Sequence, residues 1–415
     1  MTQKNTLGYP QIVLIILSLV MTLSANKVIG QKITEDLYEA GYEAYDNGDY
    51  PSAIDYCGRA IKRKPDFADA YWLRASAYFN YNQVGPAIDD YTKTISLLKD
   101  TDKDLSEVYV NRGFAYMTIN NVDKAIADYT TAIDLNPNNS QAIWDRGIAY
   151  QELGIFDTAI SDYSVAAQYY QKDRYSLSVI YTNRAQCFVN LKRFDQAIAD
   201  CNSAILLNPD NGSSFWIKGI VYEQIYQPDK AIKELEHALT FYENDEPDLS
   251  KLYWKIGFDY YLIKNYKKAL TRYDRAIMYN SKYEQAYYTR GLLLLNKLNK
   301  EKKAKHDFDK LANPGKETNY YTVVGKYFLG DKNVVLSYLK NFPDSFTTAS
   351  QMNSAYFDAA CLYSLMAEEQ NAIIYLEKAL YSGYNDYYNV KTEVALEPIR
   401  QTPAYQDLIK KYGVN

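Results

Sequence analysis

The sequence is poor in the residues that interrupt helices. Its 415 residues include only 18 Gly and 12 Pro, whereas a turn-rich β fold draws heavily on both. Hydrophobic residues make up 47% of the chain and charged residues 23%, which excludes the composition of a disordered segment. We therefore expect an ordered protein that is built from long helices.

The chain also lacks an excess of positive charge. Lys and Arg total 46 and Asp and Glu total 51, so the formal net charge is −5. A protein that neutralises several phosphates needs a basic surface. Nucleic acid is therefore not expected as a partner.

Histidine is scarce, because His237 and His306 are the only two. A histidine pair at helical spacing that could chelate a metal ion is absent, and a Ser-His-Asp triad would depend on one of these two residues. His306 lies among lysines and His237 precedes a small residue, so we expect both imidazoles to be solvated. The sequence predicts a protein that is not an enzyme and has no metal or other cofactor.

One acidic segment begins like a calcium-binding loop. Asp100, Asp102 and Asp104 have the spacing of the first three ligands. Such a loop also needs a glycine at its sixth position and a glutamate at its twelfth, and these places hold Leu105 and Asn111. We interpret the segment as a polar linker before a helix, where the helix dipole favours carboxylates.

The N-terminal apolar run is too short to span a bilayer comfortably. It extends from Ile12 to Leu23, whereas a membrane-spanning helix needs about 20 apolar residues. Lys4 precedes the run, which is typical of a secretory signal. We expect a signal peptide over residues 1–25, or up to Gly30, and an exported chain that is periplasmic or secreted. If the segment is not cleaved, it is the expected membrane anchor.

The sequence does contain a recurring string, Ala-Ile-x-x-(Tyr/Cys)-x-x-(Ala/Thr)-Ile. The string and its variants begin at Ala53, Ala87, Ala125, Ala159, Ala197, Ala231 and Ala269. The steps between them alternate between 34 and 38 residues, which gives a period of 72. This pattern indicates serial duplication of a unit that contains two repeats.

A second helical pattern precedes these strings, with an aromatic or aliphatic residue, a small residue four positions later and an aromatic three positions after that. Tyr109, Gly113 and Tyr116 are one example, and spacings of four and three place such residues on one helix face. Glycine in a helix costs about 1 kcal/mol relative to alanine. Its recurrence at Gly147 and Gly219 therefore predicts the close approach of a neighbouring helix. Each repeat is expected to be a helical hairpin that buries its apolar face by stacking on the next.

These residues resemble the tetratricopeptide repeat, and residues 106–139 match its signature most fully. The resemblance implies an all-α fold, a right-handed α-solenoid of helical hairpins. Eight repeats are expected over residues 34–317, at 34–67, 68–101, 106–139, 140–173, 178–211, 212–245, 250–283 and 284–317. Residues 318–350 look helical but do not follow the pattern. A further hairpin is expected at 353–386, and residues 390–415 resemble the helices that cap many such arrays.

The four cysteines do not suggest a disulfide framework, which is typical of small exported domains that cannot build a core. Cys57 and Cys201 fall where the repeat places core side chains, so we expect buried thiols. A Cys187–Cys201 bridge is the alternative, because both residues would lie in one hairpin.

In this family the concave groove that the first helices form is the usual binding surface. The resemblance therefore implies a non-catalytic scaffold that binds a protein or peptide. The groove residues that we expect are Tyr38, Trp72, Phe114, Trp144, Trp216, Trp254 and Tyr288. Family members that clamp the carboxylate tail of cytosolic chaperones carry Lys and Asn at fixed groove positions. The equivalent positions here include Tyr38, Trp72 and Trp144, so this clamp is absent.

Trp72, Trp144 and Trp216 are 72 residues apart, and Tyr288 continues the series. One interpretation is that duplication copied a packing residue. The other is a stripe of rings that binds an extended peptide, because Trp and Tyr are enriched among residues that dominate binding energies. A glycan-binding module is the alternative function, since exposed aromatic faces also stack on sugar rings.

Overall fold

The computed structural model describes residues 30–99, 104–242, 246–312, 318–340 and 348–414. The chain divides into two compact units, Met1–Arg193 and Phe194–Asn415, which are described separately below. Within the described residues the regular structure is entirely helical, which confirms the expected all-α solenoid fold. The expected signal segment over residues 1–25 lies outside the described residues. None of the helices that the structure describes combines the length and hydrophobicity of a membrane span.

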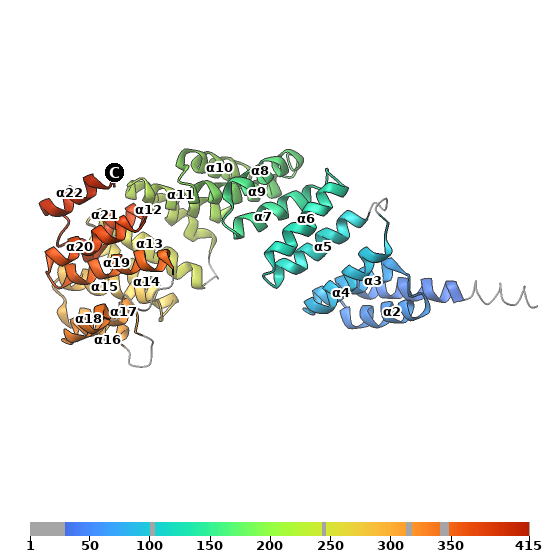
Figure 1. Cartoon of the computed structure of the whole chain (residues 1–415), viewed down its shortest axis with the longest axis horizontal. Helices are drawn as coiled ribbons and strands as arrows, with labels where there is room; N and C mark the ends of the chain where they lie inside the picture. Colours follow the sequence, from blue (N-terminus) through green and yellow to red (C-terminus); the bar gives the residue numbers. More distant parts are fainter. Residues whose placement is uncertain (1–29, 100–103, 243–245, 313–317, 341–347, 415) are drawn as a thin grey trace, which may run out of the picture. The chain divides into compact units, whose positions relative to one another are not determined.

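The N-terminal unit consists of consecutive antiparallel helices (Figure 1). A helix over residues 30–46 comes first. The helices that follow are α2 (Tyr50–Arg63), α3 (Ala68–Asn80), α4 (Val84–Leu97), α5 (Leu105–Thr118), α6 (Val122–Leu135), α7 (Ser140–Glu152), α8 (Phe156–Tyr169) and α9 (Arg174–Asn190). The range where the repeat signature is fullest, 106–139, thus holds α5 and α6.

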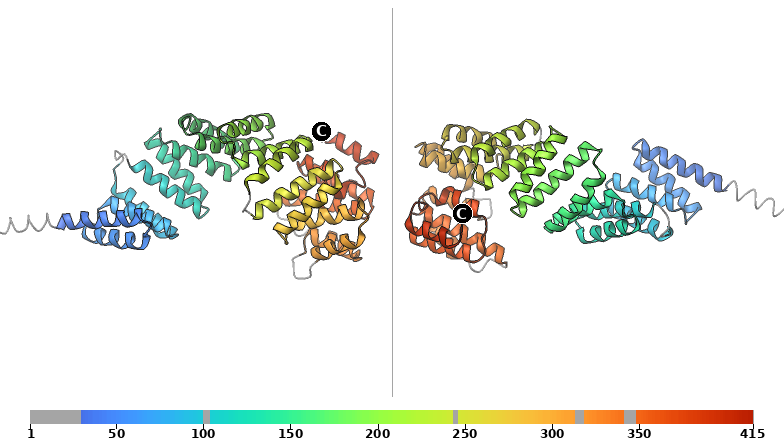
Figure 2. Two further views of the ribbon diagram at one scale, coloured as in Figure 1. Left: turned by 180° about the vertical axis from the view of Figure 1, so that it is seen from behind. Right: turned by 90° about the horizontal axis from the view of Figure 1, so that it is seen from above.

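The C-terminal unit continues the succession of paired helices (Figure 2). Its first part contains α10 (Phe194–Leu207), α11 (Gly212–Gln224), α12 (Pro228–Ala238), η1 (Leu239–Phe241), α13 (Glu246–Leu262), α14 (Tyr266–Tyr279), α15 (Glu284–Asn296) and α16 (Glu301–Leu311). Its second part contains α17 (Tyr320–Phe328), α18 (Asn333–Lys340), α19 (Ala349–Leu365), α20 (Glu369–Tyr381), α21 (Tyr387–Thr392), η2 (Val394–Leu396) and α22 (Pro403–Lys411). The off-pattern segment is itself a hairpin, α17 and α18, and α17 packs against α16.

Residues with left-handed backbone geometry close the hairpins. Asn120, with φ of 58°, follows α5, and Gly154, with φ of 73°, follows α7. Asn121 then donates its backbone N–H to the carbonyl of Tyr116, the long hydrogen bond that ends many helices at such a residue. Gly and Asn tolerate this conformation best, which is why these short turns could be located from the sequence.

Close contact between a glycine and a buried side chain joins the two helices of several hairpins. A Cβ atom on Gly113 would lie 2.7 Å from Cε1 of Tyr129, and one on Gly147 would lie 3.0 Å from the same atom of Tyr163. Gly219 faces Leu235 in the same way. The prediction that the helical glycines mark close helix approach is therefore confirmed.

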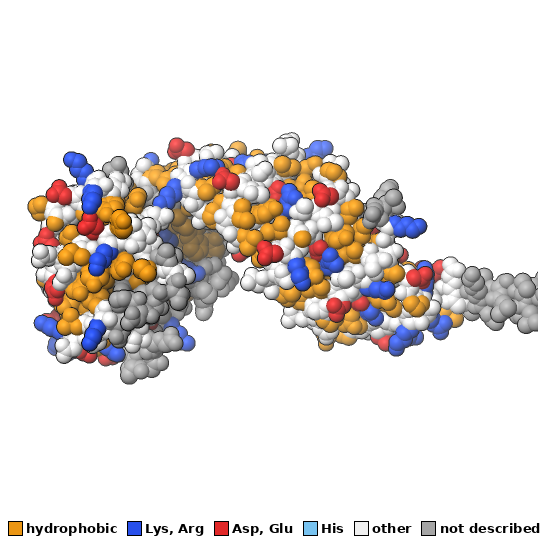
Figure 3. Space-filling model, viewed as in Figure 1, with side chains coloured by type: hydrophobic (Ala, Val, Ile, Leu, Met, Phe, Trp, Pro, Cys, Tyr) orange, Lys and Arg blue, Asp and Glu red, His pale blue; other side chains and the backbone are white. Residues whose placement is uncertain are grey.

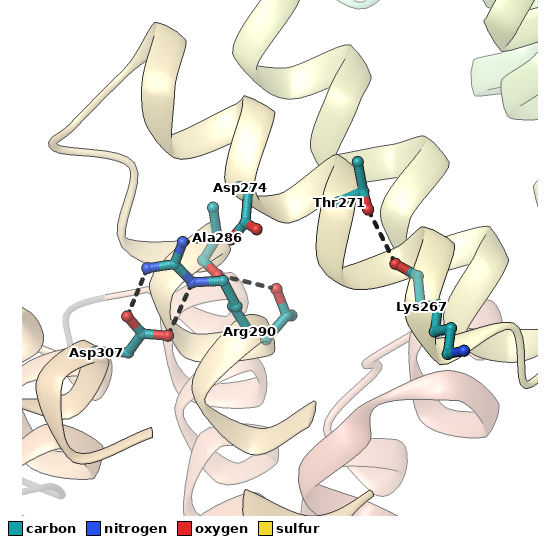
Figure 4. Close-up of polar contacts among 7 residues, drawn as sticks. Lys267, Thr271, Asp274, Ala286, Arg290 and Asp307 are labelled. Carbon is teal, nitrogen blue, oxygen red and sulfur yellow. Dashed lines mark hydrogen bonds and ion pairs between the residues drawn. The ribbon is translucent and has the colours of Figure 1, made fainter. Parts of the chain in front are cut away.

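Buried ion pairs also join the two helices of a hairpin. Arg112 of α5 forms two hydrogen bonds to Asp128 of α6, at 2.8 and 2.7 Å, and its guanidinium lies over the ring of Tyr109. Equivalent pairs are Arg74–Asp90, Arg146–Asp162, Lys218–Glu234 and Arg290–Asp307. Figure 4 shows the guanidinium of Arg290 facing the carboxylate of Asp307. Two-pronged contacts of this kind fix geometry as well as charge.

We predict that Asp128→Asn destabilises the N-terminal unit by about 3 kcal/mol. Removal of one partner leaves the buried Arg112 charge uncompensated, which costs about 3–5 kcal/mol in buried pairs, and Arg112 retains some solvent contact. The measurement is urea denaturation of the full chain followed by circular dichroism. Asp123→Asn is the control, because Asp123 is exposed on the same helix. Equal denaturation midpoints for the two variants would contradict a structural role for the pair.

Candidate functional site

Trp144 and Trp216 make similar contacts in their respective repeats. Each indole is half-buried and meets a tyrosine ring edge-on, Tyr170 at 5.4 Å and Tyr242 at 5.5 Å between ring centroids. The indole N–H of each is buried without a hydrogen-bond partner. The interpretation of the series as copied packing residues predicts contacts of this kind.

Tyr38, Trp72 and Phe114 lie on first helices of the N-terminal unit. Tyr38 is half-buried and its ring lies 5.1 Å from that of Phe67. Trp72 packs partly buried against the cluster around Tyr91. Phe114 is 52% exposed, and its ring contacts Phe79 of the preceding repeat. Phe114 is thus the most accessible of the expected groove residues in this unit.

Trp254 and Tyr288 line one cavity in the C-terminal unit. The cavity has a volume of about 360 Å³, within the range of small-ligand sites. The first helices α11, α13 and α15 supply one side of it, and α17, α19 and the segment around α21 supply the other. Tyr288 is only 3% exposed, so it faces this enclosed space rather than an open groove.

The segment from α21 to η2 lies against first helices and thereby encloses the cavity. Tyr288 of α15 donates a hydrogen bond to Glu393 at 2.6 Å, and Tyr261 of α13 donates one to Glu397 at 2.6 Å. Lys297, which follows α15, also pairs with Glu397 at 2.6 Å. The sequence predicts a cap for residues 390–415, and α22 does pack on α20. The docking of the preceding residues on α13 and α15 was not predicted.

Aromatic rings form much of the cavity wall. They belong to Trp254, Phe258, Tyr288, Tyr320, Tyr321, Phe357, Tyr384 and Tyr388. Trp254 stacks on Phe258 and donates its indole N–H to Thr289 at 3.2 Å, and Phe357 stacks on Tyr384 at 4.5 Å. These contacts hold the rings in fixed orientations around the cavity.

The charged groups of the wall are mainly acidic. Glu223, Asp358, Asp386 and Glu393 line the cavity together with one cationic side chain, Lys255. Lys255 is already paired with Glu223 at 2.6 Å. Burial, together with the nearby Glu393, raises the pKa of Asp358 to about 7. The excess negative charge is local, since acidic and basic side chains are interspersed on the face of the molecule in Figure 3.

Asp259 is a second acidic residue in an unfavourable setting. It is 0% exposed, and neither carboxylate oxygen has a hydrogen-bond partner. It follows Phe258 of the cavity wall and interacts electrostatically with Glu223 and Lys255. Burial raises the pKa of Asp259 well above its usual value, and the charge of Glu223 adds to this effect.

The four cysteines are free and buried, so the Cys187–Cys201 alternative is wrong and the expectation of buried thiols is confirmed. Cys361 lines the cavity. Burial raises the pKa of this thiol well above its usual value, with Glu393 and Asp358 contributing. Because the thiolate is the reactive form, Cys361 is poorly suited to act as a nucleophile.

The two histidines lie apart from the cavity wall. His237 is exposed and stacks on Phe215 at 4.0 Å between centroids, and His306 is exposed on α16. Within the part of the chain that the structure describes, no three His, Cys, Asp or Glu side chains are arranged to hold a metal ion.

Models of the tetratricopeptide repeat match four segments of the chain. They cover residues 38–94, 106–139, 178–211 and 354–382. Two of these ranges, 106–139 and 178–211, coincide with repeats delimited from the sequence.

A short segment is also similar to a chloroplast protein of the plant Arabidopsis thaliana. The two are 31% identical over 65 residues, which cover 16% of this chain and 19% of the plant protein. The match therefore spans about a fifth of that relative.

Solved structures share the fold. The C-terminal part of a tetratricopeptide repeat protein from Cytophaga hutchinsonii aligns with 60% of this chain and 97% of its own, with 16% identity and a TM-score of 0.50. A tetratricopeptide repeat protein from Parabacteroides merdae aligns with 72% of this chain and 100% of its own, with 16% identity and a TM-score of 0.42. The family models, the paired helices and the likeness to the Cytophaga structure assign the architecture. The chain therefore contains tetratricopeptide repeats, and they occur in both of its units.

Proposed function

We propose that the chain is a non-catalytic scaffold that binds a protein or peptide, and that the cavity of the C-terminal unit is its principal contact site. The observation that carries this proposal is the enclosure of about 360 Å³ between the first helices and the α21 segment. Repeat arrays bind partners through the surfaces that their stacked helices create. Here that surface includes Trp254 and Tyr288, both expected from the sequence as ligand contacts.

The cavity suits binding better than chemistry. Its wall holds fixed aromatic rings and carboxylates, whereas acid-base catalysis most often uses a histidine. His237 stacks on an aromatic ring and His306 lies on α16. The glycan-binding alternative gains no support from the comparisons.

Obstruction of the cavity mouth should abolish partner binding. Ser354 is exposed on α19 and lines the cavity, so Ser354→Trp should fill the space with little cost to folding. Met352→Trp is the matched control, because Met352 is exposed on the same helix. The measurement is cross-linked affinity capture from an extract of the source organism, quantified by mass spectrometry.

We expect the wild type and Met352→Trp to recover the same protein and Ser354→Trp to lose at least about 90% of it, which corresponds to a loss of about 1.4 kcal/mol or more. Recovery of no specific protein would contradict the scaffold proposal. Equal recovery by both variants would show that the partner binds elsewhere on the chain.

We further infer that the chain is exported, and the support is the apolar run Ile12 to Leu23 that follows Lys4. The mature protein, isolated from its source, should begin after Ala25 or after Gly30, because signal peptidase removes such a segment. Intact-mass measurement of the envelope and secreted fractions provides the check. Recovery of the full-length chain from the cytoplasmic fraction alone would contradict export.

A further inference from the structure

The acidic groups of the cavity are not neutralised by the residues around them. Asp358 has no hydrogen-bond or ion-pair partner among the described residues. The ionisable groups that interact with it are Glu393 of the segment between α21 and η2, Tyr320 and Tyr321 of α17, Tyr338 of α18, Cys361 of α19 and Tyr384. Of these groups, only Glu393 is charged at neutral pH, and its charge is negative.

Glu393 is held in place by neutral donors. It accepts a hydrogen bond from the hydroxyl of Tyr288 at 2.6 Å and one from the backbone N–H of Ala395 at 3.0 Å. The nearby Arg400 donates to the backbone carbonyl of Glu393. Two carboxylates thus share the cavity, while its lysine, Lys255, is paired with Glu223.

Asp259 provides an independent sign that this region favours a positive charge. It occupies the tenth position of its repeat, and the same position in other repeats holds Ala115, Ala149, Val221 and Leu293, all fully buried. An unpaired carboxyl group at such a place is costly to bury. Departures of this kind from a repeated pattern concentrate at functional sites.

The remaining wall is aromatic, which also favours a cation. The faces of Trp, Tyr and Phe rings attract ammonium and guanidinium groups, and the attraction increases when the cation is desolvated. Trp254, Phe258, Tyr321 and Phe357 line the cavity together with the two carboxylates. Its exposed wall residues are Ser354 and Asp386, so a further acidic side chain marks the opening.

We propose that this cavity binds an organic cation, a primary ammonium or guanidinium group, between Asp358 and Glu393 and the surrounding aromatic rings. The inference rests on the proposed function for its site and specifies the ligand chemistry. The same group could be supplied by a lysine or arginine side chain of a polypeptide or by a free amine. Either source would complete the charge balance that the wall residues leave open.

The test uses the full-length chain and isothermal titration calorimetry at pH 8. The probes are the peptide acetyl-Gly-Lys-Gly-amide, the same peptide with norleucine in place of lysine, and cadaverine. We expect the lysine peptide to bind at least tenfold more tightly than the norleucine peptide, which has an apolar side chain of similar length. Lysine peptide binding stronger than that of cadaverine identifies a polypeptide source, and the reverse identifies a free amine.

Asp358→Asn should weaken binding of the cationic probe at least tenfold, whereas Asp229→Asn, at an exposed residue of the same unit, should leave it unchanged. A second readout uses the wild type alone. Because the pKa of Asp358 is raised to about 7, a proton competes with the cation at low pH, and the affinity should fall about tenfold between pH 8 and pH 6.

Equal binding of the lysine and norleucine peptides, unchanged binding by Asp358→Asn, or no binding of either cation would overturn the inference. The failure of the scaffold proposal is separate. If cations bind but no partner is captured, the cation site stands and the scaffold proposal fails. If a partner is captured through the cavity but no cation binds, the scaffold proposal stands and the cation site fails.

Discussion

The structure depends on the close contact between a small residue on the first helix of a hairpin and a bulky side chain on the second. Gly113 against Tyr129 and Gly257 against Tyr273 leave no room for an additional methyl group without rearrangement. This proximity places Arg112 within reach of Asp128 across the same pair of helices. Since one hairpin cannot bury its outer apolar face, the next hairpin stacks on it and the core continues through each unit.

The candidate site lies where the repeated pattern changes. In the repeat that contains α13, Ile256 and Arg272 occupy the positions that a basic and an acidic residue hold in the neighbouring repeats. Arg272 instead pairs with Glu236 of α12 at 2.7 Å, and Lys255 pairs with Glu223 of α11 at 2.6 Å. Ion pairing therefore shifts from within a repeat to between repeats, beside the cavity. The same repeat places Asp259 where other repeats bury apolar residues.

Much of this architecture could be predicted from the sequence, because duplication leaves a periodic record. The 72-residue period located the hairpins, the helical glycines and the series that leads to Tyr288. The change from Cys187 to Asp259, also 72 residues apart, was available as a signal but was not used. The docking of the C-terminal segment could not be predicted. Its contact between Tyr261 and Glu397 joins residues 136 positions apart, and no periodic pattern connects them.

The central claim is that the segment from α21 to η2 docks on first helices and encloses an acidic, aromatic cavity. Amide hydrogen exchange of the full-length chain tests it most directly, because buried and hydrogen-bonded amides exchange slowly. The account predicts that residues 387–396 are protected to a degree comparable with α13 and α15. Rapid exchange across these residues, as in an exposed tail, would contradict it.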